Sequence, residues 1–205
     1  MRFGSSALLI ALWAAPPIAL GQAASWPTDP WAHQLATEHA RLAQCSAAAP
    51  SITNHSLGPI QLGMPISEVR RACPNLIYAW RILEGQAEPV ALAQFGRVTA
   101  EIEFADTLPS TGVYRIVTRS GAARTPDSVG PGTPASELAR RLGPLELVVG
   151  EGPLYAIPRQ HKGYSFELMV PGEWDWDLIM RVQRTNNPNL LPPGTRVSQV
   201  LIVGP

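Results

Sequence analysis

The sequence predicts an α+β fold with two similar halves, each a short helix followed by about four antiparallel strands, and an extra N-terminal helix. Two observations favour this fold. A short glycine-proline-glutamate motif occurs twice, beginning at Gly63 and again at Gly132. A series of strand-like segments follows each copy, and such grouping of strands beside few helices is typical of α+β proteins.

The two copies of the motif, residues 63–74 and 132–143, share a glycine, a proline, a Ser-Glu pair and an arginine at equal spacing. A glycine turn followed by a proline at the first helical position predicts a short helix in each copy. In the second copy, Thr133 has the side chain of a good N-cap. Pro74 and Gly143 end the two helices.

Apolar and polar residues alternate in the segments after each helix. In segment 98–104, Val98, Ala100 and Ile102 alternate with polar side chains, as in a strand with one buried face. In all, we expect strands at 75–83, 90–95, 98–104 and 113–118 in the first half, and at 145–149, 154–157, 164–170 and 197–203 in the second.

These patterns divide the chain into a leader (1–21), an N-terminal helical segment (22–50), a first helix-plus-sheet repeat (51–124) and a second repeat (125–205). In the N-terminal segment, residues 31–45 lack glycine and proline and predict one amphipathic helix. Residues 171–196 interrupt the second repeat. Their Asn-Asn-Pro-Asn and Pro-Pro-Gly strings are typical of loops, so we expect a long loop excursion there.

The leader has the order of a secretory signal peptide. Arg2 precedes an apolar run at 7–15, prolines follow, and the small residues Ala19 and Gly21 suit cleavage after Gly21. An N-terminal membrane anchor is the alternative, but the apolar run is shorter than the roughly 20 residues that a spanning helix needs. We therefore expect a periplasmic or secreted protein with no membrane span in the mature chain.

The charge balance excludes one class of partner. The 16 basic and 16 acidic residues cancel, and no basic tract is present, so nucleic-acid binding is not expected. Lys162 is the one lysine in a chain rich in arginine, alanine, glycine and proline, a bias that indicates a GC-rich bacterial genome.

The two cysteines, Cys45 and Cys73, predict a disulfide, because an even pair in an exported chain meets an oxidising compartment. Two buried free thiols are the alternative.

The string Glu-Trp-Asp-Trp-Asp at 173–177 is the most unusual in the chain. On an exposed strand it would place three carboxylates on one side and two indole rings on the other. Tryptophan is favoured at interface hot spots, so Trp174 and Trp176 form a candidate binding surface. The carboxylates could alternatively favour calcium, or the rings could simply cover the sheet.

No pattern indicates catalysis or a resident cofactor. His33 and His39 are six residues apart and do not share one helix face as zinc ligands would. The chain has no Gly-x-Ser-x-Gly motif, and no spacing favours a nucleophile with its base. We predict no catalytic residue, no metal ligand and no cofactor.

The two copies of the motif also resemble those of a known type of protein module. The resemblance rests on Gly132, Thr133, Glu137, Leu138, Leu142, Gly143 and Pro144, and more weakly on Gly63, Glu68, Val69 and Pro74. Over roughly residues 58–170 the chain resembles the tandem modules of β-lactamase-inhibitor proteins and of small outer-membrane-assembly lipoproteins. It departs from them at Cys73-Pro74, where Leu-Gly is expected, and it lacks their lipidated cysteine. No binding residue carries over.

The resemblance implies a non-catalytic module that works by protein–protein contact. We therefore expect an exported bacterial protein that binds another envelope or secreted protein. The alternative is a hydrolase or a small-ligand-binding protein whose site is assembled from residues distant in sequence.

Overall fold

The computed structural model describes residues 44–46, 50–83, 85–150 and 152–204. It confirms the α+β class. The signal peptide and most of the expected helix at 31–45 lie outside the described residues. The expected helix does not reach Cys45, because Gln44–Ser46 form strand β1, which pairs in parallel with β5.

The first half contains β2 (Ser56–Leu57), β3 (Ile60–Gln61), α2 (Ile66–Ala72), β4 (Ile77–Leu83), β5 (Gln86–Phe95), β6 (Val98–Phe104) and β7 (Val113–Thr118). The second half contains α3 (Ala135–Leu142), β8 (Leu145–Val149), β9 (Leu154–Pro158), β10 (Tyr164–Met169), α4 (Trp176–Thr185), the 3-10 helix η1 (Pro188–Leu190) and β11 (Arg196–Val203). The bounds expected for β6, β7 and β8 are the observed ones.

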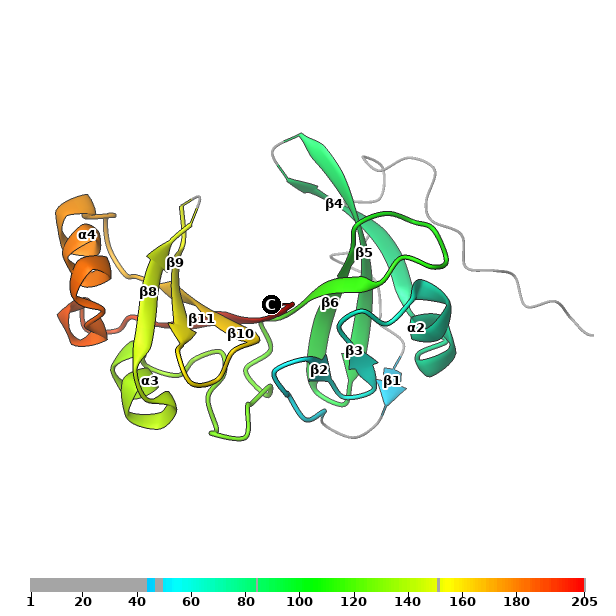
Figure 1. Cartoon of the computed structure of the whole chain (residues 1–205), viewed down its shortest axis with the longest axis horizontal. Coiled ribbons are helices and arrows are strands. Elements are labelled where there is room, and N and C mark those ends of the chain that lie inside the picture. The colour runs from blue at the N-terminus through cyan, green and yellow to red at the C-terminus, as the bar shows by residue number, and fades with distance from the viewer. Residues whose placement is uncertain (1–43, 47–49, 84, 151, 205) are drawn as a thin grey trace, which may run out of the picture.

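Nine of these strands form one sheet. Its order is β1-β5-β6-β7-β11-β10-β9-β8, and β4 pairs with β5. The last strands of the two halves, β7 and β11, pair antiparallel at the centre, where Val117 lies opposite Leu201. The sheet is bent at this central pair, so the two halves form the arms of an open V (Figure 1).

The two copies of the motif make the same backbone contacts. The Gly63 amide donates to the Val113 carbonyl at 2.7 Å, and the Gly132 amide donates to the Val197 carbonyl at 2.8 Å. Both glycines have positive φ, 78° and 89°, which glycine adopts without a steric penalty. The repeat is therefore structural: in each half, the turn before the helix is bonded to the start of the last strand.

A β-bulge is repeated as well. Glu103 pairs with Arg115, but the next pair is Phe104 with Val113, which leaves Tyr114 as the extra residue. In the second half, Glu167 pairs with Gln199 and Leu168 pairs with Val197, which leaves Ser198 as the extra residue. Bulges redirect side chains within a strand pair, and here both occur beside a glutamate.

The helices cover their own halves. Ile66 and Val69 of α2, and Leu138 and Leu142 of α3, are buried in one continuous core with the strands. Thr133 does not cap α3 as expected: Pro134 occupies the N-cap, and the Thr133 hydroxyl accepts a hydrogen bond from the Gly130 amide at 3.1 Å.

The predicted disulfide is confirmed. Cys45 of β1 is bonded to Cys73, the residue after α2, with 4.9 Å between their Cα atoms. The bond ties the parallel edge strand β1 to the end of the helix in the first half.

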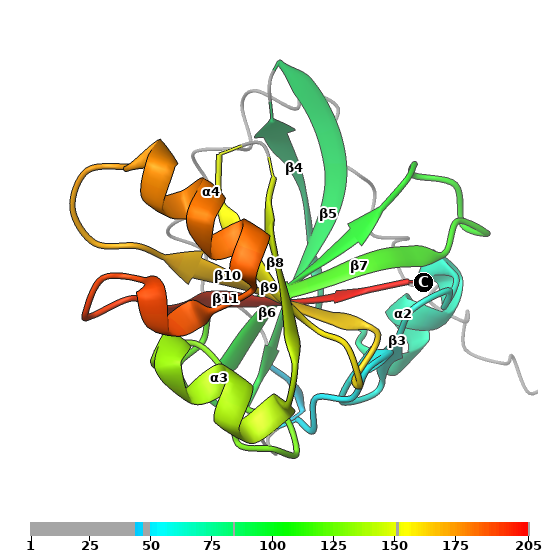
Figure 2. The ribbon, with the colours of Figure 1, turned by 60° about the vertical axis from the view of Figure 1, so that its left-hand side comes forward.

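The expected loop at 171–196 is wrong for Trp176–Thr185, which form α4. Asp175 caps this helix by accepting from the Leu178 amide at 3.1 Å. Ile179 and Val182 are its buried residues, at helical spacing. At its other end, the Asn186 side chain accepts from the Leu147 amide at 2.7 Å, so α4 covers the outer edge of β8 (Figure 2).

Candidate binding cleft

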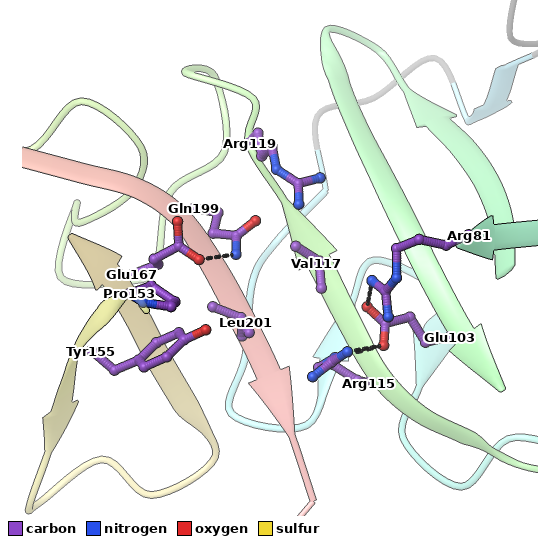
Figure 3. Close-up of a pocket in the computed structure, with 10 residues that line it drawn as sticks. All are labelled: Arg81, Glu103, Arg115, Val117, Arg119, Pro153, Tyr155, Glu167, Gln199 and Leu201. Atoms are coloured by element: carbon purple, nitrogen blue, oxygen red, sulfur yellow. Dashed lines mark hydrogen bonds and ion pairs between the residues drawn. The ribbon is translucent and has the colours of Figure 1, made fainter. Parts of the chain in front are cut away.

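A cavity of about 490 Å³ opens on the sheet face where the two halves meet. Its walls come from β4, β6 and β7 on one side and from β9, β10 and β11 on the other (Figure 3). Val117 and Leu201, which face each other across the β7–β11 pair, lie between the walls and form an apolar floor. We call this cavity the cleft.

The first-half wall is a network of ion pairs around Glu103. The Glu103 side chain is 0% exposed and contacts Arg81 and Arg115, each with a nitrogen-to-oxygen distance of 2.5 Å. Arg81 also contacts Glu101 at 2.6 Å and is bonded to Glu88. A buried carboxylate requires such partners, because an unpaired one would be costly.

The network sets the protonation states of this wall. Burial alone would raise the pKa of Glu103, but hydrogen bonds from Arg81 and Arg115 hold it below its ordinary value. Burial would lower the pKa of Arg81, yet its bonds to Glu103 and Glu88 raise it. Burial, and then the adjacent Glu103 carboxylate, raise the pKa of Tyr114 to about 12. At neutral pH the wall therefore holds charged arginines and a charged Glu103, and the phenol of the neighbouring Tyr114, outside the cleft lining, is neutral.

The second-half wall is centred on Glu167 and has no arginine. Its carboxylate accepts from the Ser198 hydroxyl at 2.8 Å and from the Gln199 side-chain amide at 2.5 Å. The other polar atom of Gln199, Oε1, is buried and has no hydrogen-bond partner among the residues that the structure describes. Tyr155 pairs with Glu167 in the register of β9 and β10, and its side chain lines the cleft near Pro153 and Leu201 (Figure 3).

Arg119 lies at the first-half side of the cleft. Its side chain is 61% exposed, and within the described part of the chain its one ion pair is a 3.7 Å contact with Glu101. Exposed pairs of this length contribute little. Arg119 is therefore a cation that a bound partner could engage at low cost.

These residues can form hydrogen bonds and ion pairs over an apolar floor. The lining contains no serine, cysteine or histidine, so the described residues give the cleft no such nucleophile and no imidazole base. Within the described ranges, no three histidine, cysteine or acidic side chains come together to hold a metal ion. Among these residues no helix is both long and apolar enough to cross a membrane.

The candidate surface of Trp174 and Trp176 lies elsewhere, at the start of α4. The two residues do not lie on an exposed strand: Asp175 is the N-cap of α4 and Trp176 is its first residue. The rings pack edge to face, 5.7 Å apart. Trp174 is half-buried against the core, whereas Trp176 is 57% exposed. The acids therefore do not line one side of a strand.

Sequence reasoning missed the cleft residues. Glu101 and Glu103 alternate with apolar residues, a pattern that indicates a solvent-facing side, and nothing in it shows that Glu103 is fully buried. The usable signal was the duplication. Once the strands after each motif are aligned from their last members backwards, β6 with Glu101 and Glu103 corresponds to β10 with Glu167, each beside the central pair.

No protein-family model and no curated protein matches the chain. Among solved structures, the chain is similar to the uncharacterized protein YfeY from Escherichia coli, with a TM-score of 0.50 and 16% sequence identity. The match covers 75% of this chain and 99% of YfeY. At this identity the similarity concerns the fold alone.

Proposed function

We propose that the chain is an exported protein that binds another envelope or secreted protein through the cleft. The observation that carries this proposal is that both repeats build the cleft jointly, where β7 and β11 join their halves of the sheet. A concave sheet face made by two tandem modules suits a protruding segment of a partner. The resemblance to tandem inhibitor and assembly modules supports the same mode of action.

The chemistry of the cleft supports binding rather than catalysis. Interfaces are enriched in arginine and tyrosine, and energetic hot spots lie in partly enclosed pockets. The cleft offers Arg119, Tyr155 and the apolar Val117–Leu201 floor to such a partner. Its central glutamate, Glu103, is held by two arginines and is therefore not available for proton transfer.

Export is supported by two independent features. The leader has the pattern of a signal peptide, and the Cys45–Cys73 disulfide suits an oxidising compartment. Cell fractionation with intact-mass measurement tests this part: the expected product, lacking residues 1–21, lies in the periplasmic or secreted fraction.

A small polar ligand is the second candidate. The cleft volume of about 490 Å³ falls within the range of small-molecule sites, and the unpartnered Gln199 oxygen could accept a hydrogen bond from such a ligand. Native mass spectrometry of the purified protein would reveal a retained small molecule.

The deciding experiment is quantitative affinity capture from envelope extract with the wild-type chain and two charge-reversal variants. Arg119→Glu changes the cleft, while Arg184→Glu changes an exposed arginine of α4 outside the cleft lining. We expect one stoichiometric partner with wild type and with Arg184→Glu, and at least about tenfold less of it with Arg119→Glu. Equal capture by all three chains would contradict the proposal.

A further inference from the structure

We infer that Glu167 and Gln199 form a receptor for a guanidinium group, supplied by an arginine side chain of the bound partner. This inference rests on the proposed function, since it names the chemistry that one wall of the cleft recognises. It is carried by the internal symmetry of the cleft, by the missing counter-charge of Glu167, and by one buried unpartnered oxygen.

The symmetry makes the two walls directly comparable. Glu103 and Glu167 each lie on the third strand after the helix of their repeat, immediately before a bulge. The bulge residue beside each carboxylate carries a hydroxyl, Tyr114 in one half and Ser198 in the other. The residue opposite each glutamate is Arg115 in the first half and Gln199 in the second.

The two glutamates differ in their counter-charge. Glu103 is contacted by the guanidinium groups of Arg81 and Arg115. Within the described residues Glu167 makes no ion pair, and its side-chain bonds come from the neutral Ser198 hydroxyl and Gln199 amide. In the first half, guanidinium groups thus neutralise the glutamate carboxylate at this position. In the second half, no guanidinium group of the described residues occupies the equivalent place beside Glu167.

The Gln199 side chain adds a second acceptor at this site. Gln199 is only 7% exposed, it lines the cleft, and no described residue is a hydrogen-bond partner of its Oε1. The bond from its Nε2 to Glu167 fixes the orientation of the amide. A buried acceptor without a partner costs free energy until a donor arrives. The Glu167 carboxylate, and the Gln199 oxygen on the amide group that donates to it, give this wall two acceptors for the forked donors of a guanidinium.

Tyr155 completes the wall. It pairs with Glu167 in the strand register and lines the same cavity (Figure 3), and burial, followed by the charge of Glu167, raises the pKa of its phenol. Arginine guanidinium groups stack on aromatic faces more readily than lysine ammonium groups do. The first half already contains such a pair, Arg115 over the Tyr114 ring at 5.4 Å. This favours arginine over lysine as the recognised side chain.

The test uses a probe that needs no knowledge of the partner. The full mature chain is titrated with N-acetylarginine methylamide while the side-chain amide signal of Gln199 is followed by NMR. The matched control probe is N-acetylcitrulline methylamide, which has nearly the same shape and no charge. We expect a saturable shift of the Gln199 signal with the arginine probe, with a millimolar dissociation constant, and at least about tenfold weaker binding of the citrulline probe.

Three variants locate the binding. Glu167→Gln should abolish saturation by the arginine probe, while Glu146→Gln, on an exposed carboxylate of β8, should leave it unchanged. Gln199→Arg recreates the arrangement of the first half, and here probe binding is followed on the Tyr155 ring signals. We expect its own guanidinium to occupy the site, to exclude the probe and to raise the melting temperature.

Several outcomes would overturn the inference: no saturable shift with the arginine probe, equal shifts with both probes, or unchanged binding to Glu167→Gln. None of these bears on the capture experiment, whose readout is the Arg119→Glu variant. If capture depends on Arg119 while the probe fails, the partner uses the cleft without presenting an arginine to Glu167. If the probe binds while capture fails, the receptor exists and the proposed partner does not.

Discussion

Glu103 on β6 and Glu167 on β10 occupy the same position in the two repeats, yet among the described residues only Glu103 has arginine partners. Part of the difference is an exchange in the facing strand, Arg115 against Gln199, and the other arginine partner of Glu103 is Arg81 of β4. In the first repeat, Glu103 is thus part of a structural ion-pair network. In the second repeat, Glu167 lines the cleft, where a bound partner can supply the missing positive charge.

The first prediction concerns this asymmetry. Glu103→Gln should lower the free energy of unfolding by about 3 kcal/mol, because it leaves two partly buried arginines without their shared carboxylate. Glu167→Gln should cost less than about 1 kcal/mol, because its bonds are to neutral groups and an amide oxygen can accept them. Urea unfolding at neutral pH measures both. Equal losses in the two variants would contradict the assignment of different roles.

A second prediction follows from the depressed pKa of Glu103. The unfolded chain binds a proton at an ordinary glutamate pKa of about 4.3, whereas folded Glu103 binds it only at lower pH. Its contribution to stability is therefore fully present above the unfolded pKa and is lost as pH falls through the folded one. Unfolding free energies measured from about pH 6 down to about pH 3 should fall more steeply for wild type than for Glu103→Gln. Parallel curves would show that Glu103 does not carry this acid sensitivity.

Much of the fold could be predicted from the sequence because the signals were local. The two glycine-proline turns, the short helices and the alternation in β6 each depend on neighbouring residues, and the structure has them. The start of α4 misled the sequence reading because alternating Trp and Asp mimic a strand, while the same Asp175 is a helix N-cap. Its apolar residues Ile179 and Val182 were the signal for a helix.

The cleft could not be predicted in the same way. It depends on the antiparallel pairing of β7 with β11, two strands far apart in sequence that no local pattern brings together. It also depends on two bulges, each of which shifts the register by one residue. Only the resulting geometry shows that Glu103 is buried and that Gln199 has an oxygen without a partner.

A third prediction concerns the disulfide. Because the bond joins cysteines 28 residues apart, the chain-entropy model predicts that its loss costs about 3–4 kcal/mol. Cys45→Ser with Cys73→Ser should therefore lower the melting temperature by roughly 10 °C in a domain of this size. The native protein should contain no free thiol when titrated under denaturing, non-reducing conditions. Two titratable thiols in protein isolated from the envelope would contradict the bond.

The last prediction separates the two tryptophans at the start of α4. Trp174→Ala should lower the free energy of unfolding by about 2–3 kcal/mol, because the half-buried ring packs against the core. Trp174→Phe should cost less than about 1 kcal/mol, since it keeps an aromatic ring and removes the buried indole N–H that has no partner. Trp176→Ala should change stability by no more than about 0.5 kcal/mol, because the ring is mostly exposed. Denaturant unfolding combined with affinity capture distinguishes these roles. If Trp176→Ala loses the captured partner at unchanged stability, Trp176 belongs to a second contact surface. If capture is unchanged, recognition is restricted to the cleft.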